Sequence, residues 1–386
     1  MLICGVPASM LHITKNRAKR IWLNAQRLDT RAPFGDDQRA TRTAIEHLGY
    51  VQIDTINVIE RSHHHILFTR IPHYKRAHLH QAQKFDKTVF EYWTHALSYV
   101  PVRDFRFFLA AMKRHRTAPG KWFDAVTKDD LRKVLRLIRE QGALSIRDID
   151  DDVLVEKDHP WASRKPSRRA LQLAFFTGAV AISQRSGMLK TYELADRHFG
   201  WEGRPKAATE AEIADYLIDR ALRSQGVVNL DSICYLDAKR KSRVLRLIEK
   251  RVRRKQLVAV EIDGVATPQY WIEPGTLDLN LRPLEELVHI LSPFDPLVIQ
   301  RKRLGSFFGY EHRFEAYVAK EKRVFGYFTL PVLAGDEIVA AIDLKTDRQR
   351  RELLVQKWTW VGRKSGNPLK QIIEEELHRF ERFQLS

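Results

Sequence analysis

The sequence predicts an α+β protein that is rich in helices. Two observations favour this fold class. A similar order of elements, helices followed by one or two strands, recurs three times, and the C-terminal part instead shows short alternating apolar and polar runs. The chain has 386 residues, of which 44% are hydrophobic and 30% are charged. This composition is typical of a globular protein with two to four domains.

The first unit opens with a helix predicted over residues 18–28 and a second helix over residues 38–48. Gly49 directly follows the second helix, where glycine commonly ends a helix. A strand is predicted next, over residues 50–54. Because strand side chains alternate between two faces, Gln52 and Asp54 are expected to share one face, and their apolar neighbours the opposite, buried face.

The second unit repeats this order. Thr127 is a plausible N-cap for a helix that ends at Gly142, and a basic helix begins at Ser167. Two strands over residues 179–183 and 189–194 then form a predicted hairpin.

The third unit shows the pattern most clearly. Residues 209–212, Thr-Glu-Ala-Glu, form a capping box before an amphipathic helix, and a short helix follows at residues 230–236. A strongly basic helix over residues 238–255 leads into strands at 257–262 and 270–272. Helices followed by a two-stranded wing make a winged-helix unit, in which a helix commonly approaches a DNA groove.

The C-terminal part is predicted to be a small antiparallel β-barrel. Strands over residues 313–318 and 324–328 are expected to bracket the hairpin tip Lys320–Arg323, and further strands are expected at 337–344 and 351–360. A last helix, residues 368–383, is expected to pack on this barrel. The predicted domains are three winged-helix units, 1–125, 126–205 and 206–285, and a C-terminal barrel with its helix, 286–386.

The charge of the chain favours a nucleic acid as partner. Sixty-six Lys and Arg residues against 48 Asp and Glu give a net charge of +18, and such an excess suits a polyanion. An acidic membrane surface is the rival partner, but no apolar run approaches a membrane span and no signal peptide is recognised. Cys4 and Cys234 have no zinc or disulfide spacing, which fits the reducing cytoplasm.

Other chemistries are less favoured. His63, His64 and His65 could bind a metal, but adjacent side chains project in different directions, so hydrogen bonding in a core or to a phosphate is the preferred interpretation. No phosphate-binding loop, dinucleotide motif or nucleophilic-hydrolase motif is present. The aromatic stretch 91–96 could stack on a base, although such clusters are more often part of a core.

Gln52 and Asp54 remain as the candidate catalytic pair. A carboxylate on a DNA-facing unit has the wrong sign for binding phosphates, so a module that only binds DNA has no evident use for it. An enzyme that cleaves a base–sugar bond does have one, because an anion stabilises the oxocarbenium-like transition state.

The sequence closely resembles the bacterial YcaQ/AlkZ family of winged-helix DNA glycosylases, and within it the YcaQ branch. The matching residues are Gln52-Ile53-Asp54, the stretch 55–64, Glu91-Tyr92-Trp93-Thr94-His95, Leu291-Ser292-Pro293-Phe294-Asp295-Pro296 and the stretch 326–333. The resemblance implies a C-shaped clamp around duplex DNA, excision of N-alkylated purines such as N7-alkylguanine, and unhooking of interstrand crosslinks. The AlkZ branch has Gln-Φ-Gln where this chain has Gln-Φ-Asp, which favours the broader YcaQ-like substrate range.

These considerations predict a monofunctional DNA glycosylase that acts as a monomer in the cytoplasm, on the nucleoid, with no cofactor, no metal and no membrane contact. Asp54 is expected to stabilise the cationic deoxyribose and activate a water molecule that Gln52 holds. The alternative is a non-enzymatic winged-helix transcription regulator. Residues expected to contact DNA are Asn57, His63, His64, Arg70, Trp93, His95, Arg301, Arg303, Lys322 and Arg323.

Overall fold

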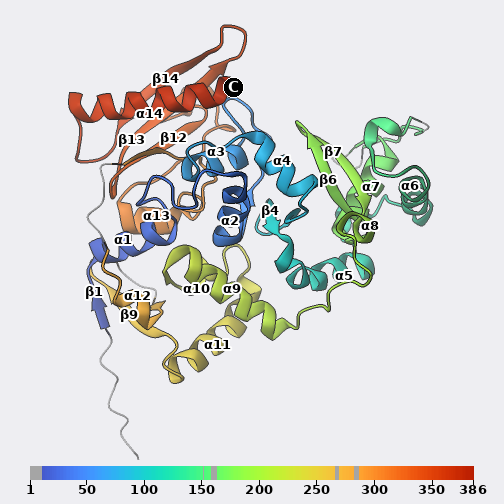
Figure 1. Cartoon of the computed structure of the whole chain (residues 1–386), viewed down its shortest axis with the longest axis horizontal. Helices are drawn as coiled ribbons and strands as arrows, with labels where there is room; N and C mark the ends of the chain where they lie inside the picture. The colour runs from blue at the N-terminus through green and yellow to red at the C-terminus, as the bar shows by residue number, and fades with distance from the viewer. Residues whose placement is uncertain (1–10, 151, 158–162, 266–268, 282–286) are drawn as a thin grey trace, which may run out of the picture. The chain divides into compact units, whose positions relative to one another are not determined.

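The computed structural model of the chain describes residues 11–150, 152–157, 163–265, 269–281 and 287–386 (Figure 1). The chain forms two compact units. The larger unit combines Met1–Tyr74 with Ala214–Ser386, and the inserted unit is the continuous segment Lys75–Ile213. The four domains delimited from the sequence stay a prediction.

The N-terminal helices of the larger unit follow local sequence signals. Helix α1 (Lys15–Ala25) begins after Thr14, whose hydroxyl accepts a hydrogen bond from the Arg17 amide at 3.2 Å. Helix α2 (Gln38–Leu48) ends at Gly49, which has φ of 79° and so uses the left-handed conformation open to glycine. Strand β2 (Val51–Gln52) is shorter than predicted, because residues 53–61 leave the sheet as an irregular loop.

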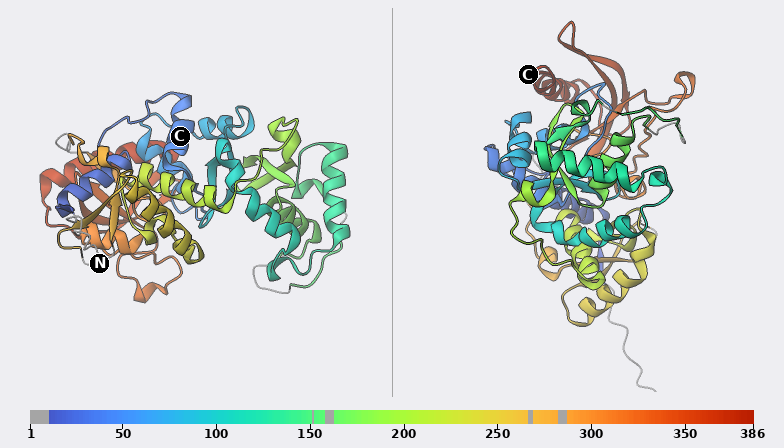
Figure 2. Two further views of the ribbon diagram at one scale, coloured as in Figure 1. Left: turned by 90° about the horizontal axis from the view of Figure 1, so that it is seen from below. Right: turned by 90° about the vertical axis from the view of Figure 1, so that its right-hand side faces the viewer.

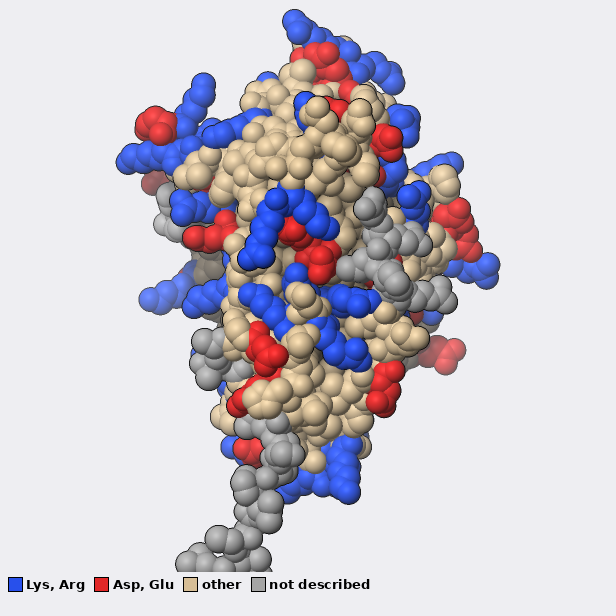
Figure 3. Space-filling model, turned by 90° about the vertical axis from the view of Figure 1, so that its left-hand side faces the viewer, with Lys and Arg blue, Asp and Glu red and all other residues tan. Residues whose placement is uncertain are grey.

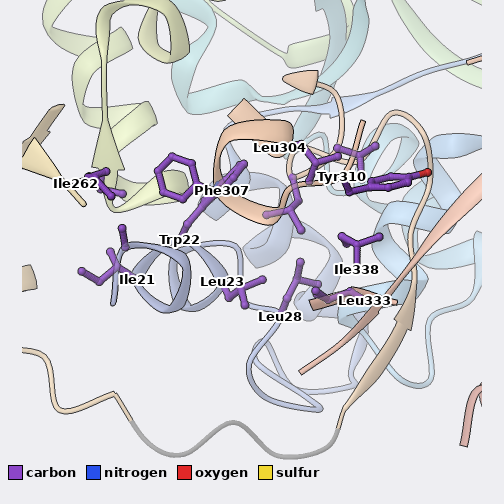
Figure 4. Packing of buried hydrophobic residues seen from close by; sticks show 14 of the residues in the cluster. Ile21, Trp22, Leu23, Leu28, Ile262, Leu304, Phe307, Tyr310, Leu333 and Ile338 are labelled. Carbon is purple, nitrogen blue, oxygen red and sulfur yellow. The ribbon is translucent and has the colours of Figure 1, made fainter. Parts of the chain in front are cut away.

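Helix α1 packs in the main core of the larger unit (Figure 4). The ring of Trp22 meets that of Phe307 edge to face, with centroids 5.3 Å apart. Phe307 belongs to α13 (Arg301–Phe308), a helix that was not predicted from the sequence. Buried residues from strands in both segments of this unit also belong to this core.

The larger unit contains a four-stranded sheet in the order β1-β9-β10-β8. The elements that build it and flank it are β1 (Leu11–Ile13), α9 (Glu210–Gln225), β8 (Val227–Val228), α10 (Leu230–Ile233), α11 (Lys241–Arg253), β9 (Val258–Ile262) and β10 (Tyr270–Ile272). The capping box before α9, the basic helix and both predicted strands are confirmed. Strand β1, which the sequence did not reveal, pairs in parallel with β9.

The predicted C-terminal β-barrel is wrong. Strands β11 (Val288–Ile290), β12 (Thr329–Ala334), β13 (Glu337–Asp347) and β14 (Glu352–Trp360) pair antiparallel in that order. Among the described residues, β11 and β14 are the open edges of this sheet, so it does not close. The strands predicted at 337–344 and 351–360 are confirmed, and together they form the long β13–β14 hairpin (Figure 1).

The strands predicted at 313–318 and 324–328 are also wrong. These residues form one loop, 311–328, coloured orange in Figure 2. The buried Glu315 carboxylate accepts hydrogen bonds from the amides of Val324, Phe325 and Gly326 at 2.8, 2.7 and 3.2 Å. The alternation of apolar and polar residues around Glu315 therefore does not mark a strand. It arises because the Glu315 carboxylate points inward and holds the loop.

The last helix, α14 (Asn367–Leu385), is confirmed and packs on more than a sheet. It contacts β11 and β14, and it also covers α3 (Ser62–Arg70). The rings of Phe68 and Phe383 stack with centroids 4.3 Å apart, and the ring of His65 lies 4.5 Å from that of Phe380. The C-terminal helix thus stabilises the helix that follows the candidate catalytic motif.

The inserted unit is made of short helices and two small antiparallel strand groups. Its elements are α4 (Arg76–Lys84), β3 (Val89–Trp93), β4 (Leu97–Pro101), α5 (Leu109–Thr117), α6 (Lys128–Gln141), β5 (Leu144–Ser145), α7 (Pro166–Phe176), β6 (Val180–Ser186), β7 (Leu189–Leu194) and α8 (Ala195–Phe199). Thr127 caps α6 in a complete capping box, and Gly142 ends it, as predicted. The buried Glu91 carboxylate pairs with Arg185 at 2.5 Å, joining β3 to β6.

An order of elements recurs in the chain. A helix, a short strand, further helical residues and a strand pair appear as α6 to β7 and again as α9 to β10. In both cases the short first strand pairs with the last strand, β5 with β7 and β8 with β10. None of the described helices has the length and apolar character needed to cross a membrane.

Candidate active site

Gln52 and Asp54 lie where β2 gives way to the loop 53–61 of the larger unit. Gln52 is buried, and its carbonyl accepts a hydrogen bond from the Ser62 hydroxyl at 2.9 Å, which ties the end of the strand to the start of α3. Asp54 is half-buried, two residues beyond the strand. The strand predicted over residues 50–54 is therefore shorter in the structure. Gln52 ends this short strand, and Asp54 lies in the loop that follows it.

Burial dominates the electrostatics of Asp54. Desolvation raises the pKa of its carboxyl group above the ordinary value of 3.8. The Ile56 amide, which donates to Oδ1 at 2.8 Å, opposes this shift because it stabilises the charged form. The same hydrogen bond fixes the orientation of the carboxylate through its own loop.

Two residues, Thr346 near the end of β13 and Arg348 just beyond it, hold the loop 53–61 by hydrogen bonds. The Thr346 amide donates to the Val58 carbonyl at 2.8 Å. Arg348 Nη2 donates to Asn57 Oδ1 at 3.0 Å and reaches the Ile59 carbonyl at 3.4 Å. Arg348 was not predicted as part of the site, since nothing in the spacing of the two segments indicates that they meet. Its presence in an arginine-rich turn was the only available signal.

The three consecutive histidines lie in α3 and face different surroundings. His64 Nδ1 is 2.7 Å from the Tyr74 hydroxyl, and His65 Nε2 is 2.8 Å from the Ile290 carbonyl. Burial lowers the pKa of His65 to about 4, so it is neutral at physiological pH. His63 is 3% exposed and its ring packs on that of His64. Within the described residues, no three His, Cys, Asp or Glu side chains are gathered as metal ligands would be.

Three of the residues predicted to contact DNA, Arg70, Arg303 and His63, are instead buried in the larger unit. Arg70 is 0% exposed, forms a bidentate pair with Asp295 at 2.7 and 3.0 Å, and donates to the Gln26 carbonyl at 2.9 Å. Arg303 is 6% exposed and its guanidinium carbon lies 4.3 Å from the Trp22 ring centroid. Neither guanidinium can reach a phosphate, so both predictions are corrected, and buried His63 is corrected with them.

The other predicted contacts are at least partly exposed. Arg301 begins α13 and Lys322 lies in the loop 311–328, both at the surface. Arg323 is half-buried and donates to the Val318 carbonyl at 2.8 Å. In the inserted unit, Trp93 ends β3 with 51% exposure, and His95 lies in the β3–β4 turn.

The excess positive charge is distributed over the surface. On the face drawn in Figure 3, Lys and Arg side chains lie between smaller groups of Asp and Glu. Many arginines are engaged locally, as Arg251 is with Asp215 and Asp219. Against this background, the half-buried carboxylate of Asp54 is suited to stabilise a cation, and the buried amide of Gln52, two positions earlier in the sequence, is suited to orient a water molecule.

Comparisons with known proteins bear on this site. A sequence model of the family described as DNA glycosylase AlkZ-like matches residues 45–383. Among solved structures, the Streptomyces sahachiroi DNA glycosylase AlkZ is similar to this chain with a TM-score of 0.62 and 15% sequence identity. The match covers 97% of this chain and 97% of that chain. At this identity the structural likeness concerns the fold, whereas the family match includes Gln52 and Asp54.

Proposed function

This chain belongs to the AlkZ-like family of DNA glycosylases, and on that premise we propose that it excises N-alkylated purines, N7-alkylguanine among them, as a monofunctional enzyme. Membership of the family makes it a hydrolase of N-glycosyl bonds that acts on DNA. The proposal adds the class of lesion, the unhooking of interstrand crosslinks, and action as a monomer in the cytoplasm, on the nucleoid.

The single observation that carries the proposal is the setting of Asp54. Alkylation at N7 makes guanine a cationic and therefore good leaving group, so the enzyme has little need to protonate the base. What remains is the positive charge that develops on the deoxyribose, and a half-buried carboxylate stabilises it more strongly than an exposed one. Asp54 would also accept a proton from the attacking water that Gln52 orients.

The outcome of the reaction follows from the residues near the motif. No lysine occurs between Tyr50 and Ser62, so the segment offers no amine for a Schiff base. We therefore expect an abasic site with an intact strand. A crosslinked base is held by the opposite strand and cannot swing fully into an enclosed pocket, which is why we propose an open site.

The binding surface is proposed from the repeated elements and the accessible contacts. The segments α6–β7 and α9–β10 have the element order of winged-helix units, and α11 carries a run of basic residues. Residues that remain as proposed DNA contacts are Asn57, His64, Trp93, His95, Arg301, Lys322 and Arg323. Three unlike units in one chain suit a monomer better than a dimer on a palindromic site.

The test is base release from defined duplexes. Wild-type protein is incubated with duplex that contains N7-methylguanine, or with a nitrogen-mustard crosslink, and free base and alkali-labile sites are measured. We expect Asp54→Asn to abolish release while it leaves duplex binding intact. Asp124→Asn, which removes an exposed carboxylate of the inserted unit, is the matched control and retains wild-type activity.

Two results would contradict the proposal. Base release by Asp54→Asn at the wild-type rate would exclude the assigned role of the carboxylate. Wild-type binding to duplex DNA without release of any alkylated base would instead favour the regulator that the sequence left as the alternative.

A further inference from the structure

We propose that Arg348 is a positioning residue that sets the loop carrying Asp54 and so couples the β13–β14 hairpin to base excision. This inference rests on the proposed function and extends it. Arg348 lies nearly three hundred residues from the motif in sequence, at the tip of a hairpin in a different sheet. Its guanidinium nevertheless contacts the loop 53–61 directly.

The loop needs outside support because it has neither helix nor strand. Residues 53–61 make no ladder hydrogen bonds, and Asn57 is exposed. Thr346 and Arg348, far along the chain, donate hydrogen bonds to the loop at Val58, Asn57 and Ile59. Contacts of this kind help to fix the conformation of a segment that has no ladder of its own.

The end of the hairpin is itself well fixed. The Asp347 carboxylate accepts hydrogen bonds from the amides of Gln349 and Arg350, both at 3.0 Å. The Thr346 hydroxyl donates to Gln384 of α14 at 3.0 Å in a buried contact. Arg348 therefore extends from a rigid turn rather than from a free tip, which reduces the entropy lost when it holds Asn57.

A short series of contacts links Arg348 to the catalytic carboxylate. Arg348 holds the Asn57 side chain, and the preceding residue, Ile56, donates its amide to Asp54 Oδ1. A shift of Asn57 would therefore move the amide that orients the carboxylate. A catalytic group displaced by even about 1 Å can lose on the order of a hundredfold in rate.

The same guanidinium can also face DNA. Within the described part of the chain, Nη2 of Arg348 serves both contacts to the loop, and Nε and Nη1 have no acceptor. A guanidinium has five N–H donors in a planar fork, so it can hold the Asn57 amide oxygen and a phosphate oxygen together. A phosphate bound there would restrain the side chain further and with it the loop.

The test separates position from charge. Single-turnover base release is measured with enzyme in excess for Arg348→Ala, Arg348→Lys and Arg350→Ala. Arg350 lies in the same turn, and its side chain is largely exposed, 3.9 Å from Glu352. We expect Arg348→Ala to lower the maximal rate constant roughly tenfold or more, Arg348→Lys to restore part of it, and Arg350→Ala to stay within about twofold.

A double-mutant cycle tests the route. If Arg348 acts through Asn57, Arg348→Ala combined with Asn57→Ala is no slower than the slower single variant. Rate losses that multiply would overturn the proposal, as would equal losses for Arg348→Ala and Arg350→Ala.

A second measurement does not depend on activity. Amide hydrogen exchange over residues 55–60 is expected to accelerate in Arg348→Ala and to stay at the wild-type rate in Arg350→Ala. Unchanged exchange in Arg348→Ala would overturn the positioning role. If the wild-type enzyme released no base, the proposed function would fail, while the exchange data would still decide whether Arg348 holds the loop.

Discussion

At the scale of single residues, the larger unit contains a half-buried carboxylate, Asp54, whose burial is costly. It also contains two buried arginines, Arg70 and Arg303. Asp54 is half-buried and forms no salt bridge with a Lys or Arg in the described part of the chain, so its ionised form is less stable than that of an exposed aspartate. Arg70 shows the opposite arrangement, since Asp295 compensates its charge completely. A buried pair of this kind costs about 3–5 kcal/mol when one partner is removed.

The raised pKa of Asp54 gives an expected pH profile. The proposed mechanism requires the ionised Asp54 carboxylate, and burial raises the pKa of this group above 3.8. The maximal rate constant for release of N7-methylguanine should therefore fall as pH decreases, with an apparent pKa above 3.8. Single-turnover rates measured across acidic pH, corrected for spontaneous depurination, check this. An acid limb at or below 3.8 would show that the titrating group is exposed, and not Asp54 in this setting.

At the residue scale, the sequence offers a prediction only where a local signal exists. The Gln52-Ile53-Asp54 motif could be found because amide and carboxylate stand two positions apart. The burial of Arg70 and Arg303 could not be predicted, because each depends on a distant partner, Asp295 in one case and Trp22 in the other. A count of basic residues does not distinguish an arginine at the surface from one inside a core.

At the scale of elements, caps and glycines marked helix ends reliably. Thr127 and Gly142 bound α6 as predicted, since a capping box and a left-handed C-terminus are local features. Helix α13 and strand β1 were not predicted, because short segments of three to eight residues take their conformation from what they pack on. The loop 311–328 was taken for a hairpin because an inward carboxylate imitates strand alternation.

The loop 311–328 has a pH dependence of its own. Burial opposes ionisation of Glu315, but the amides of residues 324–326 outweigh it, and the pKa of Glu315 falls below 4.5. The stabilisation is therefore present above pH 4.5 and lost as pH falls through the lowered pKa. We expect Glu315→Ala to cost about 1.5–3 kcal/mol of local stability at pH 7.

Amide exchange over residues 316–326 measures this cost. Glu321→Ala, which removes an exposed carboxylate of the same loop, is the control and should leave exchange unchanged. Equal exchange in the Glu315 and Glu321 variants would mean that the carboxylate does not hold the loop.

At the scale of the whole molecule, the net charge of +18 sets how the protein meets DNA. Contacts between basic side chains and phosphates release counterions, so affinity falls as salt increases. The family match and the charge therefore agree on DNA as the partner, whereas neither could predict which arginines are accessible. The overall α+β class could be predicted from the sequence, whereas the open C-terminal sheet could not.

Arg301 and Arg303 provide a matched pair for this effect. Arg301 is exposed and Arg303 is buried, two positions apart in α13. We expect Arg301→Ala to reduce the slope of log affinity against log salt by about 1. Arg303→Met should leave the slope unchanged, and duplex binding titrated at several salt concentrations, well below the melting temperature, measures both. A reduced slope for Arg303→Met would contradict its assignment to the core.

The parallel pairing of β1 with β9 has a consequence for how the chain is made. Leu11 pairs with Val260, so the strand that leaves the ribosome early must wait for a partner synthesised some 250 residues later. The inserted unit is continuous, and all of it emerges before that partner does. We expect it to fold first during translation, while the N-terminal segment that carries Gln52 and Asp54 remains unfinished until the C-terminal half arrives. A truncated chain that ends before β9 would therefore carry the catalytic motif without the sheet that completes its unit.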